Sequence, residues 1–125
     1  MPTTAIWYVN VFVSDLERSI AFYRDVLGLA VQHANPAHGY ASFDAGPIRL
    51  GLARVAPETG DPASRVGRHT GIGFGVPDLE QAYQRLRGQG VHFTAPPERQ
   101  PWGGFMALFQ DPDRNVFYLD QLRAG

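Results

Sequence analysis

The chain has 125 residues, of which 44% are hydrophobic and 18% are charged, and its formal net charge at pH 7 is −1. This length and composition predict one globular domain with its own core rather than a disordered segment. The small net charge offers no basic surface for nucleic acid or an anionic membrane, and the lack of cysteine excludes disulfide bonds and a thiolate nucleophile. The first residues, MPTTAIWYVN, lack the regions of a signal peptide, and no apolar run reaches the length of a membrane span, so we expect a cytoplasmic protein.

The first half opens with a strand pattern that passes directly into a helix pattern. Residues 8–13 alternate between aliphatic side chains and larger or polar ones, which predicts a strand with two different faces. Ser14 begins a capping box that includes Glu17, so Ser14 is predicted to cap the helix. Gly28 is expected to end that helix, because glycine tolerates a positive φ. The apolar stripe of the helix comprises Leu16, Ile20, Tyr23 and Leu27.

Three more strands are predicted in the first half, at residues 29–33, 40–44 and 48–52. A turn at Ala45-Gly46-Pro47 joins the last two. In the last strand aliphatic residues alternate with Arg49 and Gly51, so Arg49 is predicted to lie on the face opposite the helix.

The second half repeats this order of elements. Asp78-Leu79-Glu80 matches Asp15-Leu16-Glu17, follows a strand at 72–76, and starts a helix that Gly88 and Gly90 are expected to end. The predicted segments that follow are strands at 91–93, 105–109 and 116–122, a proline-broken loop at 95–101 and a tight turn at 111–115. The pattern therefore predicts two βαβββ modules, at about residues 1–53 and 69–125, joined by a linker at about 54–68.

Three segments carry a resemblance to a known family: VFVSDLERSIAFYRDVLGL, GFGVPDLEQAYQRLRGQGV and PWGGFMALFQDPDRNVFYLDQ. They resemble the vicinal oxygen chelate (VOC) superfamily, which contains glyoxalase I, extradiol dioxygenases and bleomycin-resistance binding proteins. The resemblance implies an α+β fold in which residues 1–125 form a single VOC domain and tandem βαβββ modules build an eight-stranded, incompletely closed barrel. It also implies a homodimer with a concave cleft for a small molecule.

Most members of the family hold one divalent metal ion through His, Gln or Glu side chains. The positions implied for these ligands carry other residues here, namely Tyr8, Arg49, Gly71 and Tyr118. A divalent ion needs about three or four converging nitrogen or oxygen donors. His69 is the histidine placed near the presumed cleft, and Asp44 or Asp120 are its possible oxygen partners. The leading prediction is therefore no cofactor, and the alternative is a diverged metal site around His69.

The cleft is expected to be lined by side chains and backbone from both modules, at Tyr8, Asn10, Phe12, Arg49, Gly71, Gly73, Trp102, Tyr118 and Asp120. The alternating glycines at 71, 73 and 75 indicate space for a ligand, unless Tyr8, Phe12 or Trp102 fills it. Trp102 is placed either to stack on a planar ligand or to close the barrel end. Arg49 is expected either to bind a carboxylate or phosphate of the ligand or to pair with Asp44 or Asp120.

One turn departs from the family pattern without bearing on the cleft. The family turn reads Asp-Pro-Asp-Gly-Asn, and Arg114 replaces its glycine here. This replacement predicts either a different turn conformation or some backbone strain.

The residues and the resemblance together predict a metal-independent small-molecule-binding protein of the bleomycin-resistance type. Such a protein sequesters a planar or aromatic ligand and can confer antibiotic resistance. The alternative is a glyoxalase-like enzyme, a lyase, isomerase or dioxygenase, with a diverged metal site or acid/base chemistry by His69, Tyr8 or Tyr118. A third possibility is a scaffold without a site. Convergence of His69 and Asp120 would favour chemistry, whereas an open apolar pocket beside the glycine strand would favour binding.

Overall fold

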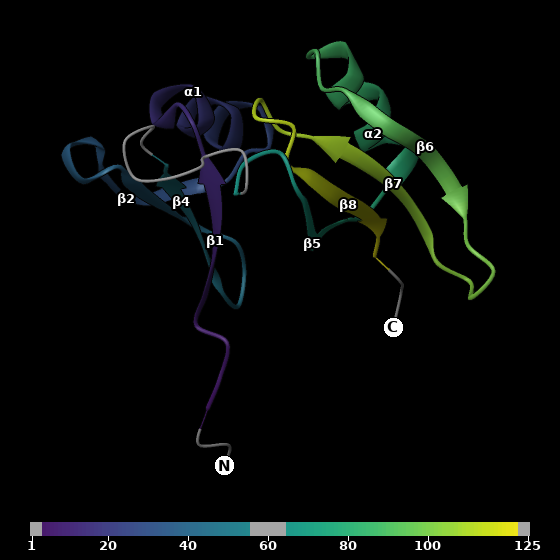
Figure 1. The fold of residues 1–125 in the computed structure, drawn as a ribbon. Coiled ribbons are helices and arrows are strands. Elements are labelled where there is room, and N and C mark those ends of the chain that lie inside the picture. Colours follow the sequence, from purple (N-terminus) through teal and green to yellow (C-terminus); the bar gives the residue numbers. More distant parts are fainter. Residues whose placement is uncertain (1–3, 56–64, 123–125) are drawn as a thin grey trace. The chain divides into compact units, whose positions relative to one another are not determined.

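The structure is a computed structural model that describes residues 4–55 and 65–122. The chain divides into two compact units, unit 1 (Met1–Val66) and unit 2 (Gly67–Gly125), shown in Figure 1. Within the described residues each unit has four strands and one α-helix in the order βαβββ. This confirms the α+β fold of two tandem βαβββ modules. That the two sheets form one barrel stays a prediction, and residues 56–64 of the predicted linker lie outside the described residues.

The sheet of unit 1 has the strand order β1-β4-β3-β2. Its strands are β1 (Tyr8–Val13), β2 (Ala30–Asn35), β3 (Tyr40–Asp44) and β4 (Arg49–Arg54). Strand β1 runs parallel to β4, and the other two pairs are antiparallel. Strands β1 and β3 have the predicted bounds, and β2 and β4 are displaced by one or two residues from theirs. Between β2 and β3, Pro36–His38 form the 3-10 helix η2.

The helix of unit 1 begins one residue later than the capping-box pattern implies. Helix α1 (Leu16–Ala21) continues as the π-helix η1 (Phe22–Val26), and Gly28 follows with a φ of 80°, as predicted for its end. The prediction that Ser14 is the cap is wrong, because Asp15 has the extended backbone of an N-cap. The Asp15 carboxylate accepts a hydrogen bond from the Arg18 amide at 3.1 Å, whereas Ser14 Oγ accepts one from the Arg18 guanidinium.

The core of unit 1 is formed by the aliphatic faces of the strands, which the alternating sequence pattern predicts to pack against the helix. Tyr23 of η1 is fully buried, and its ring centroid lies 6.0 Å from that of Phe43. The buried strand residues around them are Val11, Val13, Ala41, Phe43, Leu50 and Leu52. Tyr8 and Phe12 alternate with these valines and are exposed, so β1 has the two different faces that its sequence predicts.

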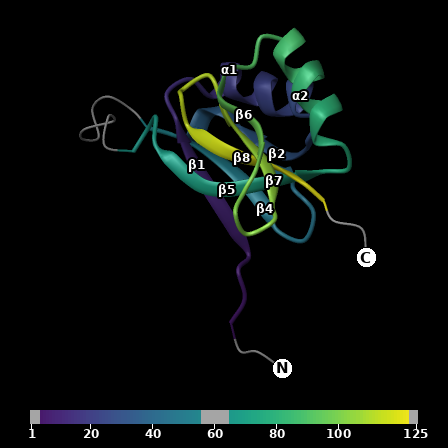
Figure 2. The same cartoon turned by 90° about the vertical axis from the view of Figure 1, so that its right-hand side faces the viewer.

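The sheet of unit 2 has the same topology, with the strand order β5-β8-β7-β6 and β5 parallel to β8. Its strands are β5 (His69–Val76), β6 (Phe93–Arg99), β7 (Phe105–Gln110) and β8 (Val116–Gln121). Helix α2 (Leu79–Gly88) is capped by the Asp78 carboxylate, which accepts a hydrogen bond from the Gln81 amide at 3.1 Å. Helix α2 packs on β6, β7 and β8, and Figure 2 shows it on one side of these strands.

The core of unit 2 is an aromatic cluster beneath α2. The rings of Phe109 and Phe117 stack with their centroids 5.5 Å apart, and the Phe74 ring lies 5.3 Å from that of Phe117. Leu79 and Leu86 bury their side chains from the helix side. The strand residues at positions 72, 74 and 76 are half-buried, which agrees with the predicted aliphatic and aromatic face.

The predicted loop at 95–101 is wrong, because strand β6 runs through most of it to Arg99. Strand β6 lies at the edge of the sheet and pairs only with β7 among the described strands. Proline lacks an amide hydrogen, yet an edge strand has unpaired backbone groups on its outer side and tolerates it. The register between β6 and β7 is irregular between Ala95 and Glu98, and that interval contains Pro96 and Pro97.

The turn between β7 and β8 is held by a buried pair of polar side chains. The Asp111 carboxylate accepts hydrogen bonds from the amide and the side-chain nitrogen of Asn115, each at 2.9 Å. Asn115 Oδ1 accepts hydrogen bonds from the amides of Gly67 and Arg68 at 2.8 and 3.3 Å, so this turn anchors the chain that enters β5. Arg114 has a φ of 68°, so it adopts the left-handed conformation usual for glycine and accepts the strain.

Replacing Asn115 with alanine is expected to lower the free energy of unfolding by about 3 kcal/mol, because it removes the acceptor of the Gly67 and Arg68 amides and the side-chain hydrogen bond to the buried Asp111 carboxylate. Chemical denaturation measures the change. Arg114→Ala, in the same turn but with an exposed side chain, is the control, for which we expect a change below about 0.5 kcal/mol. Equal effects of the two variants would contradict the anchoring role of Asn115.

Candidate functional site

The face of the unit 2 sheet opposite α2, which we name the cavity face, gathers several of the predicted site residues. His69, Gly71, Gly73 and Gly75 alternate on the exposed side of β5. In the parallel register Gly73 lies opposite Tyr118 and Gly75 opposite Asp120. The alternation of β8 places Tyr118 and Asp120 on the face away from the buried Phe117 and Leu119.

A cavity of about 370 Å³ opens on this face, lined by Trp102, Met106, Tyr118 and Asp120. Three of these residues were predicted from the sequence. Met106 was missed. The strand β7 was predicted almost in full, but its side chains were not assigned to the two faces of the sheet. The signal is the alternation of β7 around the buried Ala107 and Phe109, which places Met106 on the cavity face opposite Asp120 in the register.

The glycines of β5 are not equally open. A Cβ atom on Gly73 would lie 3.0 Å from Asp120 Oδ2, and one on Gly75 would overlap the Leu122 side chain. Gly71 has a φ of 75° and nothing within 4 Å of a Cβ position. The space beside this strand is therefore open at Gly71, lies against the Asp120 carboxylate at Gly73, and is filled by Leu122 at Gly75.

Trp102 lies at the rim of the cavity, with 64% of its surface exposed. Its ring rests over Gly104, where any Cβ atom would overlap the indole. The contact explains why a glycine is needed at this position. It also shows that Trp102 is held against its own loop rather than over the glycines of β5.

His69 lies on the cavity face, as its position two residues before Gly71 predicts. Its Nδ1 accepts a hydrogen bond from the Gly71 amide at 3.2 Å, and its ring centroid lies 5.0 Å from that of Tyr118. In the register His69 lies opposite Val116, so Tyr118 lies between His69 and Asp120 along the sheet. No hydrogen bond or ion pair joins His69 to Asp120 within the described chain, so the structure does not bring these two groups together.

Unit 1 presents its own face opposite α1. Tyr8, Asn10 and Phe12 lie there on β1, beside Arg49, Gly51 and Ala53 of β4. The side chains of Asn10 and Tyr40 occupy the space that a side chain at Gly51 would take. The Phe12 ring is contacted by the Arg65 guanidinium, whose central carbon lies 5.8 Å from the ring centroid.

Arg49 is exposed on the unit 1 face, next to a shallow cavity of about 160 Å³. It lies opposite Asp44 in the antiparallel register, yet the two side chains form no ion pair in the part of the chain that the structure describes. Asp44 instead accepts a hydrogen bond from the Gly46 amide at 3.1 Å. The expected pairing of Arg49 with Asp44 is therefore not formed.

The residues at the family's metal-ligand positions do not fit a divalent ion. Tyr8 and Tyr118 offer neutral phenols, Gly71 has no side chain, and the positive charge of Arg49 would repel a cation. Among residues 4–55 and 65–122, no group of three or more His, Cys, Asp or Glu residues is arranged to hold a metal ion.

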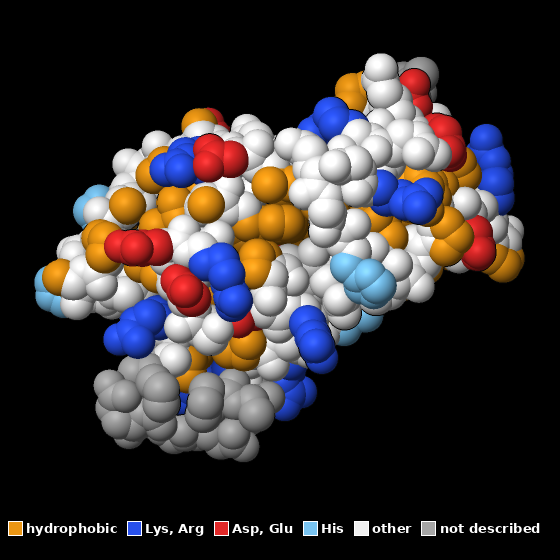
Figure 3. All heavy atoms as spheres, turned by 90° about the horizontal axis from the view of Figure 1, so that it is seen from above, with side chains coloured by type: hydrophobic (Ala, Val, Ile, Leu, Met, Phe, Trp, Pro, Cys, Tyr) orange, Lys and Arg blue, Asp and Glu red, His pale blue; other side chains and the backbone are white. Residues whose placement is uncertain are grey.

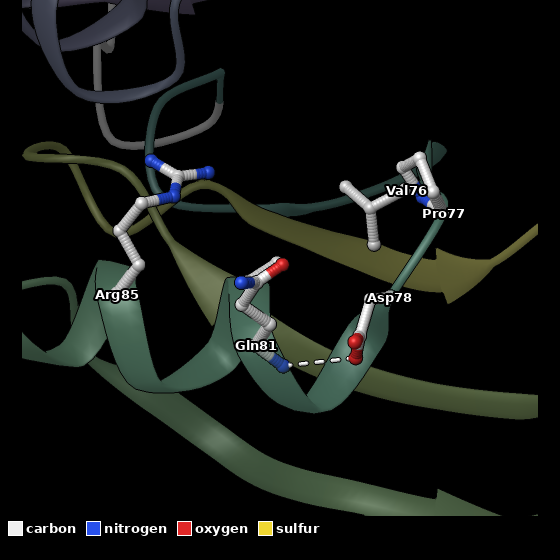
Figure 4. Close-up of a pocket in the computed structure, with 6 residues that line it drawn as sticks. Val76, Pro77, Asp78, Gln81 and Arg85 are labelled. Atoms are coloured by element: carbon white, nitrogen blue, oxygen red, sulfur yellow. Dashed lines mark hydrogen bonds between the residues drawn. The ribbon is translucent and has the colours of Figure 1, made fainter.

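A larger cavity, of about 490 Å³, lies at the connection between the end of β5 and the start of α2. Figure 4 shows Gln81 and Arg85 rising from the helix and Val76 and Pro77 at the end of the strand. Its carboxylate, Asp78, is already used to cap the helix, and no aromatic side chain lines the cavity. These features fit a groove beside a helix start better than a site for a planar ligand.

The surface charges are mixed. The face in Figure 3 shows acidic and basic side chains interspersed, in agreement with the net charge of −1. On η1 the Arg24 guanidinium donates hydrogen bonds of 2.8 and 2.9 Å to Asp25, which lower the pKa of this carboxyl. No helix of the described residues has the length and apolarity that a membrane span requires.

The fold and its motifs match a known family. The model of the Glyoxalase/Bleomycin resistance protein/Dioxygenase superfamily matches residues 5–119. The chain therefore belongs to this superfamily, which confirms the resemblance seen in the sequence.

Relatives and solved structures agree with this membership. The uncharacterized protein YraH of Bacillus subtilis is 28% identical over 119 residues, which cover 89% of this chain and 93% of that protein. The crystal structure of a superfamily member from Sphaerobacter thermophilus is 29% identical with a TM-score of 0.80, and covers 95% of this chain and 98% of its own. TnmS3, an antibiotic binding protein from a Streptomyces strain, is 28% identical with a TM-score of 0.78, and the match covers 98% of this chain and 99% of that chain.

Gly104→Ala is expected to displace the Trp102 indole, because the new methyl group occupies the position of the ring. With Trp7 replaced by phenylalanine, Trp102 is the only tryptophan, and its fluorescence reports the displacement. Gly88→Ala, where a Cβ atom meets nothing within 4 Å, is the control. An unchanged Trp102 spectrum in Gly104→Ala would contradict the contact.

Proposed function

We propose that this protein binds a planar or aromatic small molecule on the cavity face of unit 2, without a metal ion, and acts by sequestering it. The observation that carries the proposal is the cavity of about 370 Å³ between Trp102, Met106, Tyr118 and Asp120. This volume lies within the range of roughly 300–1,000 Å³ that is usual for small-molecule sites.

The chemistry of the lining suits a flat apolar ligand. Trp102 and Tyr118 provide aromatic faces for stacking, and the flexible thioether side chain of Met106 adapts to ligands of different outline. Gly71 leaves the backbone of β5 open to close approach. Asp120 adds one polar group that can orient the ligand.

The proposal extends to an antibiotic as the sequestered ligand and to a cytoplasmic homodimer. The similarity to TnmS3, an antibiotic binding protein, supports the first extension. The homodimer in the second extension rests on the family resemblance. Tyr8, Asn10, Phe12 and Arg49 are proposed as further ligand contacts on the face of unit 1, where Arg49 has no ion-pair partner among the described residues.

A second candidate function is acid/base catalysis by His69 and Tyr118. The observation that favours it is the 5.0 Å distance between their ring centroids on the cavity face. A histidine and a phenol are both able to transfer protons to a bound substrate. Under this alternative the protein would convert its ligand instead of holding it unchanged.

Trp102→Ala and Tyr118→Ala are each expected to raise the Kd for a planar ligand about tenfold, because each removes one stacking face. The probes are three tricyclic compounds, anthraquinone-2-sulfonate, phenazine and 9-aminoacridine, titrated by isothermal calorimetry. Trp7→Ala removes the other tryptophan, which is also exposed, and is expected to leave the Kd unchanged.

Unchanged affinity in both cavity variants, or no binding of any probe to the unmodified protein, would contradict the proposed site. Mass spectrometry of each probe after incubation separates the two functions. Recovery of the unchanged compound is expected for sequestration, whereas a converted product that disappears in His69→Ala would favour catalysis.

Metal independence predicts that protein purified after growth with added manganese, zinc, nickel and iron contains no stoichiometric divalent ion. Elemental analysis measures the content, and a thermal-shift scan against the same ions should show no stabilisation. One metal ion per chain that is lost in His69→Ala would contradict this part of the proposal and indicate a diverged site.

A further inference from the structure

The cavity face of unit 2 carries negative charge. Asp120 lines the cavity, and Met106 lies between Asp120 on β8 and Glu98 on β6 in the strand register. Glu98 was expected in a loop, and only the extension of β6 through its prolines places it on this sheet. Two carboxylates thus flank the apolar side chain at the cavity.

Positive side chains lie elsewhere on the described part of unit 2. Arg99 lies opposite Phe105 in the register, and its guanidinium stacks on the Phe105 ring at 5.0 Å, on the strand positions that alternate with Glu98 and Met106. The other described arginines of unit 2 lie before β5, on α2 and in the turn before β8, namely Arg68, Arg85, Arg87 and Arg114.

Neither carboxylate is neutralised by the described residues. Asp120 is half-buried, and its carboxylate accepts no hydrogen bond from the described residues. The Gln100 side chain donates a hydrogen bond to the backbone oxygen of Glu98, not to the Glu98 carboxylate. A partly buried carboxylate beside aromatic rings loses part of its solvation, and a positive group that pairs with it compensates for this loss. The lining therefore favours a cation at this point over an anion.

The aromatic side chains favour the same charge. The faces of the Trp102 and Tyr118 rings carry negative potential, which attracts a cation placed over them. Met106 separates the two carboxylates without adding charge. Carboxylates and ring faces together form the surroundings that recognise an organic ammonium or amidinium group.

We infer that the ligand of this cavity is a planar cation, an aromatic compound with a protonated amine or amidine, and that Asp120 is its counter-ion and Glu98 contributes a second negative charge. The inference rests on the proposed function and specifies the class of ligand that the cavity takes.

The test compares three tricyclic probes of similar shape and different charge. These are 9-aminoacridine, a cation at neutral pH, 9-anthracenemethanol, which is neutral, and 9-anthracenecarboxylate, an anion. Calorimetric titration of the unmodified protein is expected to rank them cation, neutral compound, anion, with the cation bound about tenfold more tightly than the neutral compound.

Asp120→Asn keeps the shape of the side chain and removes its charge, so it is expected to weaken binding of the cation about tenfold and leave the neutral compound unaffected. Glu98→Gln should act in the same direction with a smaller effect, because Glu98 is exposed. Glu80→Gln makes the same charge change on α2 and is the control, expected to alter neither affinity. Thermal denaturation verifies that each variant is folded.

The outcomes separate this inference from the proposed function. If the neutral compound binds as tightly as the cation, and Trp102→Ala weakens both, the planar-ligand site stands and the inference on charge is wrong. Equal loss of cation binding in Asp120→Asn and Glu80→Gln would also overturn the inference, because it would indicate attraction to the overall charge. If no probe binds, the proposed function fails and this inference fails with it.

Discussion

The parallel pairing of β5 with β8 is the interaction on which the candidate site depends. It places glycines of β5 opposite Tyr118 and Asp120, so the larger side chains of one strand find room beside the bare backbone of the other. Asn115 fixes the start of this pairing, because its side-chain oxygen accepts hydrogen bonds from the amides of Gly67 and Arg68 while its side-chain nitrogen donates one to Asp111. A buried polar pair at the end of the sheet therefore determines which side chains meet at the cavity.

Much of the fold could be predicted from the sequence, because its local patterns agree with its packing. The alternation of residues 8–13 has its physical basis in the pleat of β1, which buries Val11 and Val13 and exposes Tyr8. The helix start was misjudged by one residue, since Ser14 and Asp15 are both good caps and only the backbone conformation decides between them. Proline likewise predicted a loop where an edge strand tolerates it.

The candidate site could be predicted only in part, because strand parity is local and the register between strands is not. Parity placed His69, Tyr118 and Asp120 on one face of unit 2, and the structure places them there. The neighbours of Asp120 depend on how β7 and β6 align with β8, which no local pattern encodes, so Met106 and Glu98 were missed. Membership of the superfamily supplies the scaffold, while the chemistry depends on these few side chains.

The central claim is that a planar ligand binds at the cavity face of unit 2, and a nuclear magnetic resonance titration tests it most directly. Isotope-labelled protein would be titrated with the tricyclic probe that binds most tightly, and the amide and indole signals followed. The account predicts that the largest shifts occur at the Trp102 indole and at the amides of Gly71, Gly73 and Asp120. Shifts confined to the groove beside α2, between Val76 and Arg85, would contradict it.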